Sequence, residues 1–316
     1  MAEIGKDILK AKALLEAGEL VGLPTETVYG LAANALNPRA VAKIFEAKNR
    51  PSFDPLIVHT DTIEKVKTFV KYIPLDLEIL LNQFSPGPIT VLLPKEAIIS
   101  DLVTSGLERV AVRIPNHPLS LALLKSLDFP LAAPSANPFG YISPTSAQHV
   151  ENQLGQRIPY ILDGGECQVG LESTIIGFEN DKLTVYRKGG LSIESIQEVV
   201  GKVNMKEHSS SNPAAPGMLK SHYAPKKKVI FKSEYKGDFN LNKVGYLGFC
   251  ETIQNIPKKN QFLLSPEKDL NEAAQNLFKG LRFLDELDIE TVLIELVPEE
   301  GLGTAINDRL KRAAAK

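Results

Sequence analysis

A short stretch near the N-terminus concentrates side chains that could bind a polar, anionic substrate. The segment Pro24-Thr25-Glu26-Thr27-Val28-Tyr29-Gly30-Leu31 supplies hydroxyls, a carboxylate and a phenol. Lys48 and Arg50 follow as two cations separated by one residue, and His59 adds an imidazole. Hydroxyls, paired cations and a histidine at the ends of neighbouring elements suit a polyanionic, polar substrate.

Two buried strands and a helix are expected to position these side chains. Residues 19–23 form an apolar run that predicts a short buried strand leading into the loop, and loops that leave strands commonly carry function. Residues 38–48 show helical spacing, and Pro51 would stop that helix so that Lys48 and Arg50 project from its frayed end. A second strand, residues 55–59, would end in the histidine. The alternative is that the two cations only cap the helix C-terminus, where positive charge is favoured.

A third predicted strand carries two more cations. Residues 109–115 alternate so that Arg109 and Arg113 share one face while Val110 and Val112 occupy the other. Two arginines on one side of a strand form a rigid cationic pair. The alternative is that this face simply meets solvent.

The loop at residues 134–145 is rich in small polar side chains. Ser135, Asn137 and Ser143 offer hydroxyls and an amide, and the exposed backbone N–H groups of such a loop suit phosphate or ribose oxygens. The alternative is a plain surface turn followed by a helix that Ser146 caps.

Composition places the chain among ordinary globular proteins. Its 316 residues are 43% apolar, and a chain of this length favours two domains. The formal net charge of −2 argues against an overall nucleic-acid-binding surface but is compatible with a local basic pocket. The sequence shows neither a secretory signal nor an apolar run approaching 18 residues, so we expect a cytoplasmic protein without membrane contact.

Several familiar catalytic signatures are missing from the sequence. Cys167 and Cys250 are far apart and have no CxxC partner, so we expect free thiols and no metal site built from protein ligands. The sequence contains no GxxxxGK[ST], HExxH or GxSxG pattern. A P-loop, a zinc protease and a serine hydrolase therefore find no support.

The remaining pattern predicts two domains joined by a linker. Residues 4–17 read as an amphipathic scaffold helix, and residues 170–190 read as two hairpin strands before a helix at 192–201. The serine- and proline-rich residues 207–217 read as a linker. From Val229 strands alternate with helices, which is typical of a small α/β domain with a largely parallel sheet. We therefore assign residues 1–205 to a first domain, 206–228 to a linker and 229–316 to a second domain.

Blocks spread over nearly the whole chain occur in the order expected of one family. They are Pro24-Thr25-Glu26-Thr27-Val28-Tyr29-Gly30-Leu31, Lys48-Asn49-Arg50-Pro51, Ser85-Pro86-Gly87-Pro88-Ile89-Thr90, Arg113-Ile114-Pro115, Pro134-Ser135-Ala136-Asn137, Gly170-Leu171-Glu172-Ser173-Thr174, Arg187-Lys188-Gly189 and Ser221-His222-Tyr223-Ala224-Pro225. In these blocks the chain resembles the threonylcarbamoyl-AMP synthase, or YrdC-like, family in its longer form. The resemblance implies an α/β fold: a YrdC-like catalytic domain built on a twisted mixed sheet, and a second, smaller Rossmann-like α/β domain.

The resemblance also implies an activity. Such an enzyme, a nucleotidyltransferase, condenses L-threonine, bicarbonate or CO2, and ATP into L-threonylcarbamoyl adenylate and pyrophosphate, with Mg²⁺ accompanying ATP. The product supplies the N6-threonylcarbamoyl group of tRNA adenosine (t6A), which a separate complex transfers, and weak contact with tRNA is expected. Because the carbamate and the phosphates are anionic, catalysis should rest on positioning and charge neutralisation.

By family position, the site residues divide between the two substrates. Lys48 and Arg50 are the expected catalytic cations. L-Threonine would lie among Thr27, His59, Arg113, Ala133 and Ser173, with Ala133 contributing backbone or packing and Arg113 holding the carboxylate. ATP would be bound by Lys48, Arg50, Asp54, Arg109, Ser135, Asn137, Ser143, Arg187 and Tyr223, with Asp54 accepting from ribose or joining the metal and Tyr223 reaching back from the linker as a lid.

Two rival functions compete with this expectation. An RNA-binding module without catalysis would use the same arginines, but the hydroxyl and histidine positions and the mild net charge favour small substrates. A related carbamoyl transfer from carbamoyl phosphate occurs in larger chains with acylphosphatase and zinc-finger segments, which this sequence lacks.

Overall fold

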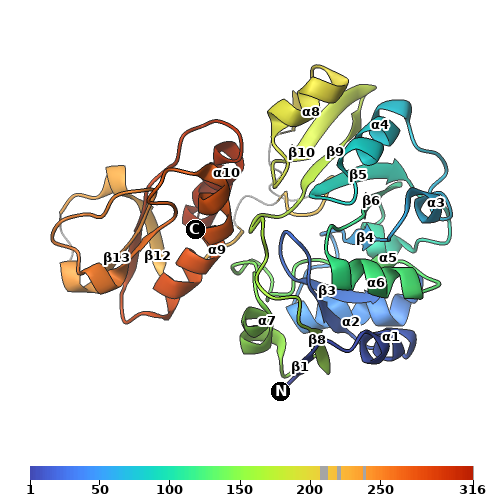
Figure 1. Cartoon of the computed structure of the whole chain (residues 1–316), viewed down its shortest axis with the longest axis horizontal. Coiled ribbons are helices and arrows are strands. Elements are labelled where there is room, and N and C mark those ends of the chain that lie inside the picture. The colour runs from blue at the N-terminus through green and yellow to red at the C-terminus, as the bar shows by residue number, and fades with distance from the viewer. Residues whose placement is uncertain (207–212, 219–221, 238–239, 316) are drawn as a thin grey trace. The chain divides into compact units, whose positions relative to one another are not determined.

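The computed structural model describes residues 1–206, 213–218, 222–237 and 240–315 (Figure 1). The chain forms two compact units. The N-terminal unit consists of Met1–Phe139, Ser143–Gln168 and Glu172–Leu219, and the C-terminal unit of Gly140–Ile142, Val169–Leu171 and Lys220–Lys316. Residues 207–212 and 219–221 of the predicted linker lie outside the described residues, so the linker stays a prediction.

A mixed sheet forms the centre of the N-terminal unit. In spatial order its strands are β1 (Glu3–Gly5), β8 (Tyr160–Leu162), β2 (Val21–Leu23), β3 (Gly30–Asn34), β7 (Leu131–Ala132), β4 (Ile57–His59), β6 (Arg109–Arg113), β5 (Ile89–Pro94), β9 (Thr174–Glu179), β10 (Lys182–Arg187) and β11 (Asn204–Met205). The sheet contains both parallel pairs, such as β4 with β6, and antiparallel pairs, such as β5 with β6. The predicted hairpin at residues 170–190 is confirmed by the antiparallel pair β9 and β10.

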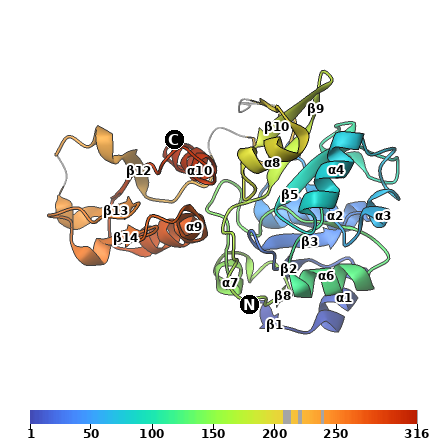
Figure 2. The same cartoon turned by 45° about the horizontal axis from the view of Figure 1, so that its top comes forward.

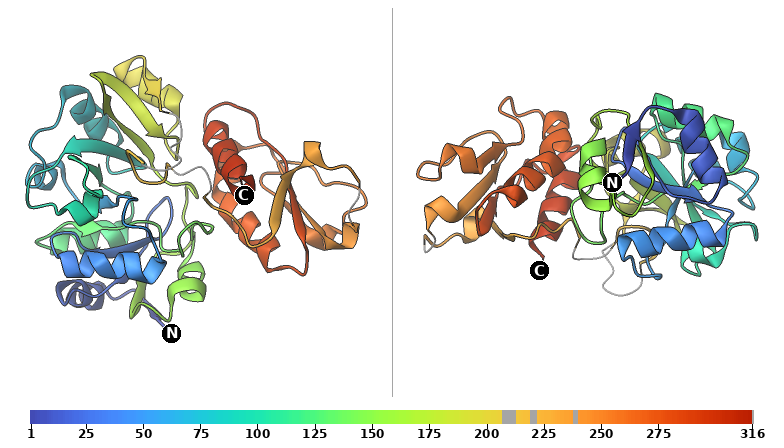
Figure 3. Two further views of the ribbon diagram at one scale, coloured as in Figure 1. Left: turned by 180° about the vertical axis from the view of Figure 1, so that it is seen from behind. Right: turned by 90° about the horizontal axis from the view of Figure 1, so that it is seen from below.

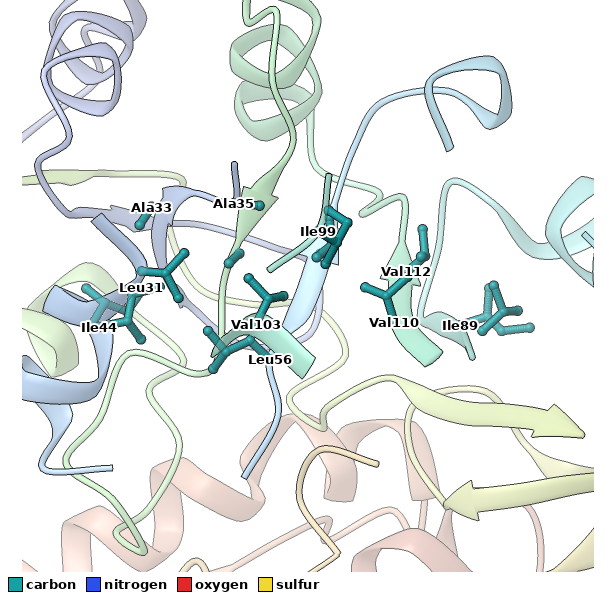
Figure 4. Packing of buried hydrophobic residues seen from close by; sticks show 14 of the residues in the cluster. Leu31, Ala33, Ala35, Ile44, Leu56, Ile89, Ile99, Val103, Val110 and Val112 are labelled. Carbon is teal, nitrogen blue, oxygen red and sulfur yellow. The ribbon is translucent and has the colours of Figure 1, made fainter. Parts of the chain in front are cut away.

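Helices cover this sheet on both faces. They are α1 (Ile8–Glu16), α2 (Pro38–Lys48), α3 (Ile63–Val66), α4 (Leu75–Phe84), α5 (Asp101–Thr104), α6 (Pro118–Ser126), α7 (Ala147–Leu154) and α8 (Ile193–Val200). The larger core lies on one face, where Leu31, Val110 and Val112 of the strands pack with Ile44 of α2 and Val103 of α5 (Figure 4). Helices α1 and α6 lie side by side on the opposite face (Figure 2).

The C-terminal unit is a small parallel α/β sheet, as predicted. Its strand order is β12 (Lys228–Phe231), β15 (Thr291–Ile294), β13 (Val244–Gly248) and β14 (Gln261–Leu263), and every pair is parallel. The elements between and after the strands are the 3-10 turns η1 (Lys232–Glu234), η2 (Leu241–Lys243) and η3 (Lys258–Asn260) and the helices α9 (Leu270–Glu286) and α10 (Gly303–Ala314). Helices α9 and α10 pack together against the sheet (Figure 3).

Three elements differ from the sequence analysis. The helix predicted from Ile4 begins at Ile8, because the Asp7 carboxylate caps it by accepting from Lys10 N–H at 3.0 Å, while residues 3–5 pair as β1 with β8. Strand β3, which begins at Gly30 directly after the polar loop and pairs with β2, was not assigned from the sequence. Strand β14 was not expected from the sequence, because its three residues are only partly buried and carry little periodic signal.

Two expectations about the whole chain can be compared with the structure. Cys167 and Cys250 are free thiols, as predicted. Across the described ranges, no helix combines the length and the apolar character that crossing a membrane requires.

Candidate active site

One half of the sheet carries polar and charged side chains on the face opposite the larger core. Alternation puts Ile57 and His59 of β4 on this face, beside Ala111 and Arg113 of β6 in matched register. The neighbouring strands β5, β9 and β10 continue the same surface with Leu92, Ile175 and Tyr186. Ala215 and Met218 pack against these apolar side chains and cover this part of the sheet. The candidate site therefore lies on this face of the sheet, and residues 213–218 cover part of the face.

Arg113 is buried and paired with a carboxylate that the sequence analysis did not assign. Its side chain is 3% exposed and its Nη2 lies 2.8 Å from Oε1 of Glu26, which is 6% exposed. Arg113 Nε also donates to the carbonyl of Gly87 at 3.3 Å. The solvent-facing alternative is wrong for Arg113, because the guanidinium lies inside the unit with its charge compensated.

Glu26 is in turn oriented by the backbone. Its Oε2 accepts from Asn116 N–H at 3.1 Å. Glu26 also lines a cavity of about 600 Å³ together with Thr25 and His117. A glutamate between two threonines in a conspicuous polar segment was visible in the sequence, but its pairing with an arginine almost 90 residues away was not.

The Thr27 hydroxyl is held so that it can accept a further hydrogen bond. Thr25 Oγ1 donates to the Val28 carbonyl at 2.6 Å and lies 2.8 Å from Thr27 Oγ1. Since Thr25 has a single hydroxyl proton, Thr27 must be the donor between the two hydroxyls. The lone pairs of the buried Thr27 oxygen are then available to an ammonium or hydroxyl group of a substrate.

His59 is buried beside Arg113 in the neutral form. Burial, and secondarily the positive charge of Arg113, lowers the pKa of His59 to about 3. The ring nitrogen Nδ1 lies 3.1 Å from the Ile57 carbonyl, to which it must donate because a carbonyl only accepts. Nε2 is therefore the acceptor nitrogen of the neutral ring.

The lowered pKa of His59 predicts a pH dependence of stability. The ordinary pKa of about 6.5 applies in the unfolded chain, so between pH 6.5 and pH 3 the unfolded state binds the extra proton and stability falls as pH falls. We expect about 2 kcal/mol of unfolding free energy to be lost between pH 7 and pH 5 through this residue. Urea unfolding at both pH values, for the wild type and for His59→Gln, measures it as the difference between the two proteins. Equal pH dependence in both would contradict a buried neutral His59.

Lys48 is the last residue of α2 and points into the polar loop. Asn37 caps the start of α2, and Asn49 ends it in the left-handed conformation (φ 51°). Lys48 is 1% exposed, and its ammonium donates to the carbonyls of Ser135 and Asn137. Burial, and secondarily Arg50, lowers the pKa of Lys48 well below its usual range. The predicted frayed helix end is wrong, and so is the capping alternative for Lys48, whose partners belong to a distant loop.

Arg50 and Asp54 form the second half of this cluster. Arg50 Nη2 lies 2.9 Å from Asp54 Oδ2, and the guanidinium also donates to the carbonyls of Asp54 and Pro55. Phe139 places its ring 5.9 Å from the guanidinium carbon. Asp54 is fully buried and balances one of the two cations.

The loop that carries Ser135 and Asn137 is not the plain surface turn of the alternative interpretation. Asn137 and Ser143 are 1% and 0% exposed, and Ser143 Oγ donates to Glu172 Oε1 at 2.6 Å. Ala133 is buried in the apolar core beneath α1 and α6. The helix capped by Ser146 is present as α7.

Ser173 is held between two other side chains. Its Oγ lies 2.7 Å from Thr90 Oγ1, and Arg187 donates to both its hydroxyl and its carbonyl at 3.0 to 3.1 Å. Gly189 permits this close packing, since a Cβ there would lie 2.2 Å from the Glu172 carbonyl oxygen. Thr90 was missed as a site residue, although it ends a block that the sequence analysis had singled out.

Arg109 and Tyr223 complete the set of expected ATP-binding residues. Arg109 is at the opposite end of β6 from Arg113, about 13 Å along the strand. It donates to Tyr186 Oη at 2.9 Å and lies 3.9 Å from a Glu179 carboxylate oxygen. Tyr223 belongs to the C-terminal unit, where its buried ring lies under the guanidinium groups of Arg309 and Arg312. The ATP roles of Arg109 and Tyr223 stay predictions.

The arrangement can bind and neutralise anions without a nucleophile of its own. Lys48, Arg50, Arg113 and Arg187 are all at most 9% exposed, and each is fixed by carbonyl, hydroxyl or carboxylate partners. Buried cations of this kind attract carboxylate and phosphate groups strongly, because little water screens them. Within the described part of the chain, no cluster of three His, Cys, Asp or Glu side chains could hold a metal ion.

Comparison with protein families accounts for almost the whole chain. A model of the Sua5/YciO/YrdC family, which carries the description telomere recombination, matches residues 13–189. A model of the threonylcarbamoyl-AMP synthase C-terminal domain matches residues 191–315. The two matches adjoin at the end of β10, before the predicted linker.

Individual relatives agree in sequence and in structure. The threonylcarbamoyl-AMP synthases of Pyrococcus abyssi and Bacillus subtilis are 39% and 38% identical to the chain, over 96% and 97% of it and 93% and 92% of their own lengths. The crystal structure of P. abyssi Sua5 complexed with L-threonine matches with a TM-score of 0.91 at 38% identity, covering 99% of this chain and 97% of that one. The chain therefore belongs to the Sua5/YciO/YrdC family of threonylcarbamoyl-AMP synthases, a family of nucleotidyltransferase-type enzymes, in the form with an additional C-terminal domain.

Proposed function

We propose that the protein is an L-threonylcarbamoyladenylate synthase that converts L-threonine, bicarbonate or CO2, and ATP into threonylcarbamoyl-AMP and pyrophosphate. The observation that supports this most is the set of contacts around Arg113: His59 lies beside it in register, and Glu26, the residue before Thr27, pairs with it. On the other side of β6, strand β5 carries Thr90, whose hydroxyl contacts Ser173. A cation, a neutral acceptor nitrogen and hydroxyls match the carboxylate, amine and hydroxyl of L-threonine. The family relative that was crystallised with L-threonine supports the same substrate.

The reaction requires two bond-forming steps. The threonine amine adds to the carbon of CO2, which gives a carbamate and releases a proton. A carbamate oxygen then attacks the α-phosphorus of ATP while the bond to the β-phosphate oxygen breaks and pyrophosphate leaves. Both steps join anionic or polar partners, so orientation and charge neutralisation supply the catalysis.

Each cluster has a part in these steps. Arg113 would hold the threonine carboxylate, with Glu26 fixing the guanidinium in place. His59 Nε2 would accept a hydrogen bond from the amine, since the neutral ring offers a lone pair there. Lys48 and Arg50 would meet the phosphates or the carbamate, and their present carbonyl and carboxylate partners hold them at a fixed position until then.

Mg²⁺ would enter with ATP rather than reside in the protein. It would neutralise phosphate charge as the pyrophosphate leaves. Mg²⁺ usually keeps several waters and takes one or two carboxylates together with substrate phosphates. Asp54 is the carboxylate in the Lys48–Arg50 cluster and would be the protein ligand.

The product would serve t6A formation in tRNA, through transfer by a separate complex. The rival role as an RNA-binding module is disfavoured by burial. Lys48 and Arg113 are 1% and 3% exposed, so their charges cannot reach a nucleic-acid backbone without a rearrangement of the site. Such cations suit a small substrate that enters the fold.

Release of pyrophosphate tests the proposal. The purified protein is incubated with ATP and Mg²⁺, and L-threonine or bicarbonate is omitted in turn. We expect release only when both are present, with L-threonine preferred over L-serine. Absence of release in every mixture, together with salt-sensitive tRNA binding, would favour the RNA-binding module.

A further inference from the structure

Two short loops of the N-terminal sequence belong to the C-terminal unit. They are Gly140–Ile142 and Val169–Leu171. Each is followed directly by residues of the candidate site: Ser143 follows the first, and Glu172 and Ser173 follow the second. Contacts that hold the two loops in place therefore also restrict the backbone positions of Ser143, Glu172 and Ser173.

The first loop is held by side chains of α9. Tyr141 Oη donates to Asp285 Oδ2 at 2.6 Å, and Arg282 Nη2 donates to the Ile142 carbonyl. The Arg282 guanidinium also lies 5.3 Å from the centre of the Tyr141 ring. Both α9 side chains are at most 7% exposed, and hydrogen bonds from a buried cation are among the stronger ones in proteins. The Gly140 carbonyl adds a bond from Ala224 N–H at 2.9 Å.

The second loop packs its backbone directly against the same helix. Gly170 has a φ of +73°, and a Cβ there would lie 2.4 Å from Gln275 Cα and 2.6 Å from the Ala274 carbonyl oxygen. Such distances leave room only for glycine, and the left-handed conformation favours it as well. Leu171 beside it is fully buried. Helix α9 thus fixes a second backbone segment at Gly170, two residues before Glu172.

A hydrogen bond also joins the residues that directly follow the two loops, Ser143 and Glu172. Ser143 Oγ donates to Glu172 Oε1 at 2.6 Å, and both residues are buried. Arg187 then binds the carbonyl and the hydroxyl of Ser173. A continuous series of short contacts and covalent bonds runs from α9 to the residues expected to contact ATP and L-threonine.

We infer that α9 is a positioning element of the synthase site, in which Arg282, Asp285 and the surface around Gln275 set the loops that carry Ser143 and Ser173. The inference rests on the proposed function for the roles of Ser143 and Ser173. It gives the C-terminal unit a task in catalysis, with Arg282 and Asp285 as positioning residues that touch neither substrate.

Amide hydrogen exchange and steady-state kinetics on the full chain test this inference. In Arg282→Met we expect exchange in the segment 140–147 to rise about 10-fold to 100-fold, as for the loss of one charge-assisted hydrogen bond, while β6 stays protected. The KM for ATP should rise about 10-fold, and Arg282→Lys, which keeps a cationic donor, should recover most of it. Lys311→Met, which removes an exposed cation of α10 paired with Glu299, is the matched control and should change neither measurement.

Two further variants keep the test decisive. Gly170→Ala should raise the KM for L-threonine more than that for ATP, since it displaces the loop before Ser173. If Arg282→Met fails to fold, Tyr141→Phe takes its place, because it removes a single hydroxyl and should still speed exchange at 140–147. Unchanged exchange and unchanged KM values in folded variants would overturn the inference. A wild type without pyrophosphate release would instead refute the proposed function, and the exchange measurement would still test the docking of the loops.

Discussion

Replacement of Arg113 by alanine is expected to raise the KM for L-threonine far more than the KM for ATP. A lost buried ion pair with the substrate carboxylate costs about 2 to 4 kcal/mol, which corresponds to roughly a 30-fold to 700-fold higher KM. We expect a selective effect because Arg113 lies beside His59 in register and pairs with Glu26, whereas Lys48 and Arg50 contact other groups. Pyrophosphate release measured at varied L-threonine and varied ATP gives both constants.

The Arg113 variant needs a control for the charge that it leaves behind. Glu26 would remain buried without its partner, and an uncompensated buried charge destabilises the fold by several kcal/mol. The double variant Arg113→Ala with Glu26→Gln removes that charge and should restore stability but not the L-threonine KM. Arg39→Ala, an exposed arginine at the start of α2, is the neutral comparison. Equal increases in both KM values would refute the assignment of Arg113 to the carboxylate.

Replacement of Lys48 by methionine should lower kcat by about 10³-fold. Methionine retains the length and fills the buried space, but it removes the only positive charge that α2 directs at the Ser135 and Asn137 carbonyls. Charge that develops on the α-phosphate and the leaving group then lacks a preorganised cation in a poorly hydrated site. Single-turnover pyrophosphate release at saturating substrates isolates this effect from binding.

A surface lysine of the same helix provides the control. Lys43 is about 39% exposed in its side chain and pairs with Glu19 at 2.8 Å, so Lys43→Met removes a charge from α2 without touching the loop. Its kcat should equal that of the wild type. A Lys48→Met enzyme that keeps kcat within about tenfold would show that Lys48 serves the packing of the loop and has no part in the chemistry.

The alternation of β6 shows how far local pattern reaches. Arg109 and Arg113 were placed on one face and Val110 and Val112 on the other from the sequence, and the core confirms it. The same pattern could not tell that the two arginines have different surroundings. Arg109 joins Tyr186 and Glu179, whereas Arg113 joins Glu26, because each partner comes from a strand or loop distant in the sequence.

The sequence by itself determined the α/β character of both units, the α2 helix that ends in Lys48, the chemistry of the side chains and the family to which they belong. Periodicity, caps and motif blocks are local properties, so they can be read without coordinates. Only the tertiary structure decided that the Lys48 ammonium binds loop carbonyls, while Asn49 ends the helix in the left-handed conformation. It also decided that Glu26 and Thr90 contact Arg113 and Ser173. Two loops of the N-terminal sequence belong to the same unit as α9, which the sequence did not indicate. These contacts depend on which strands lie beside each other and on how closely their loops pack, and burial then sets the charge state of groups such as His59.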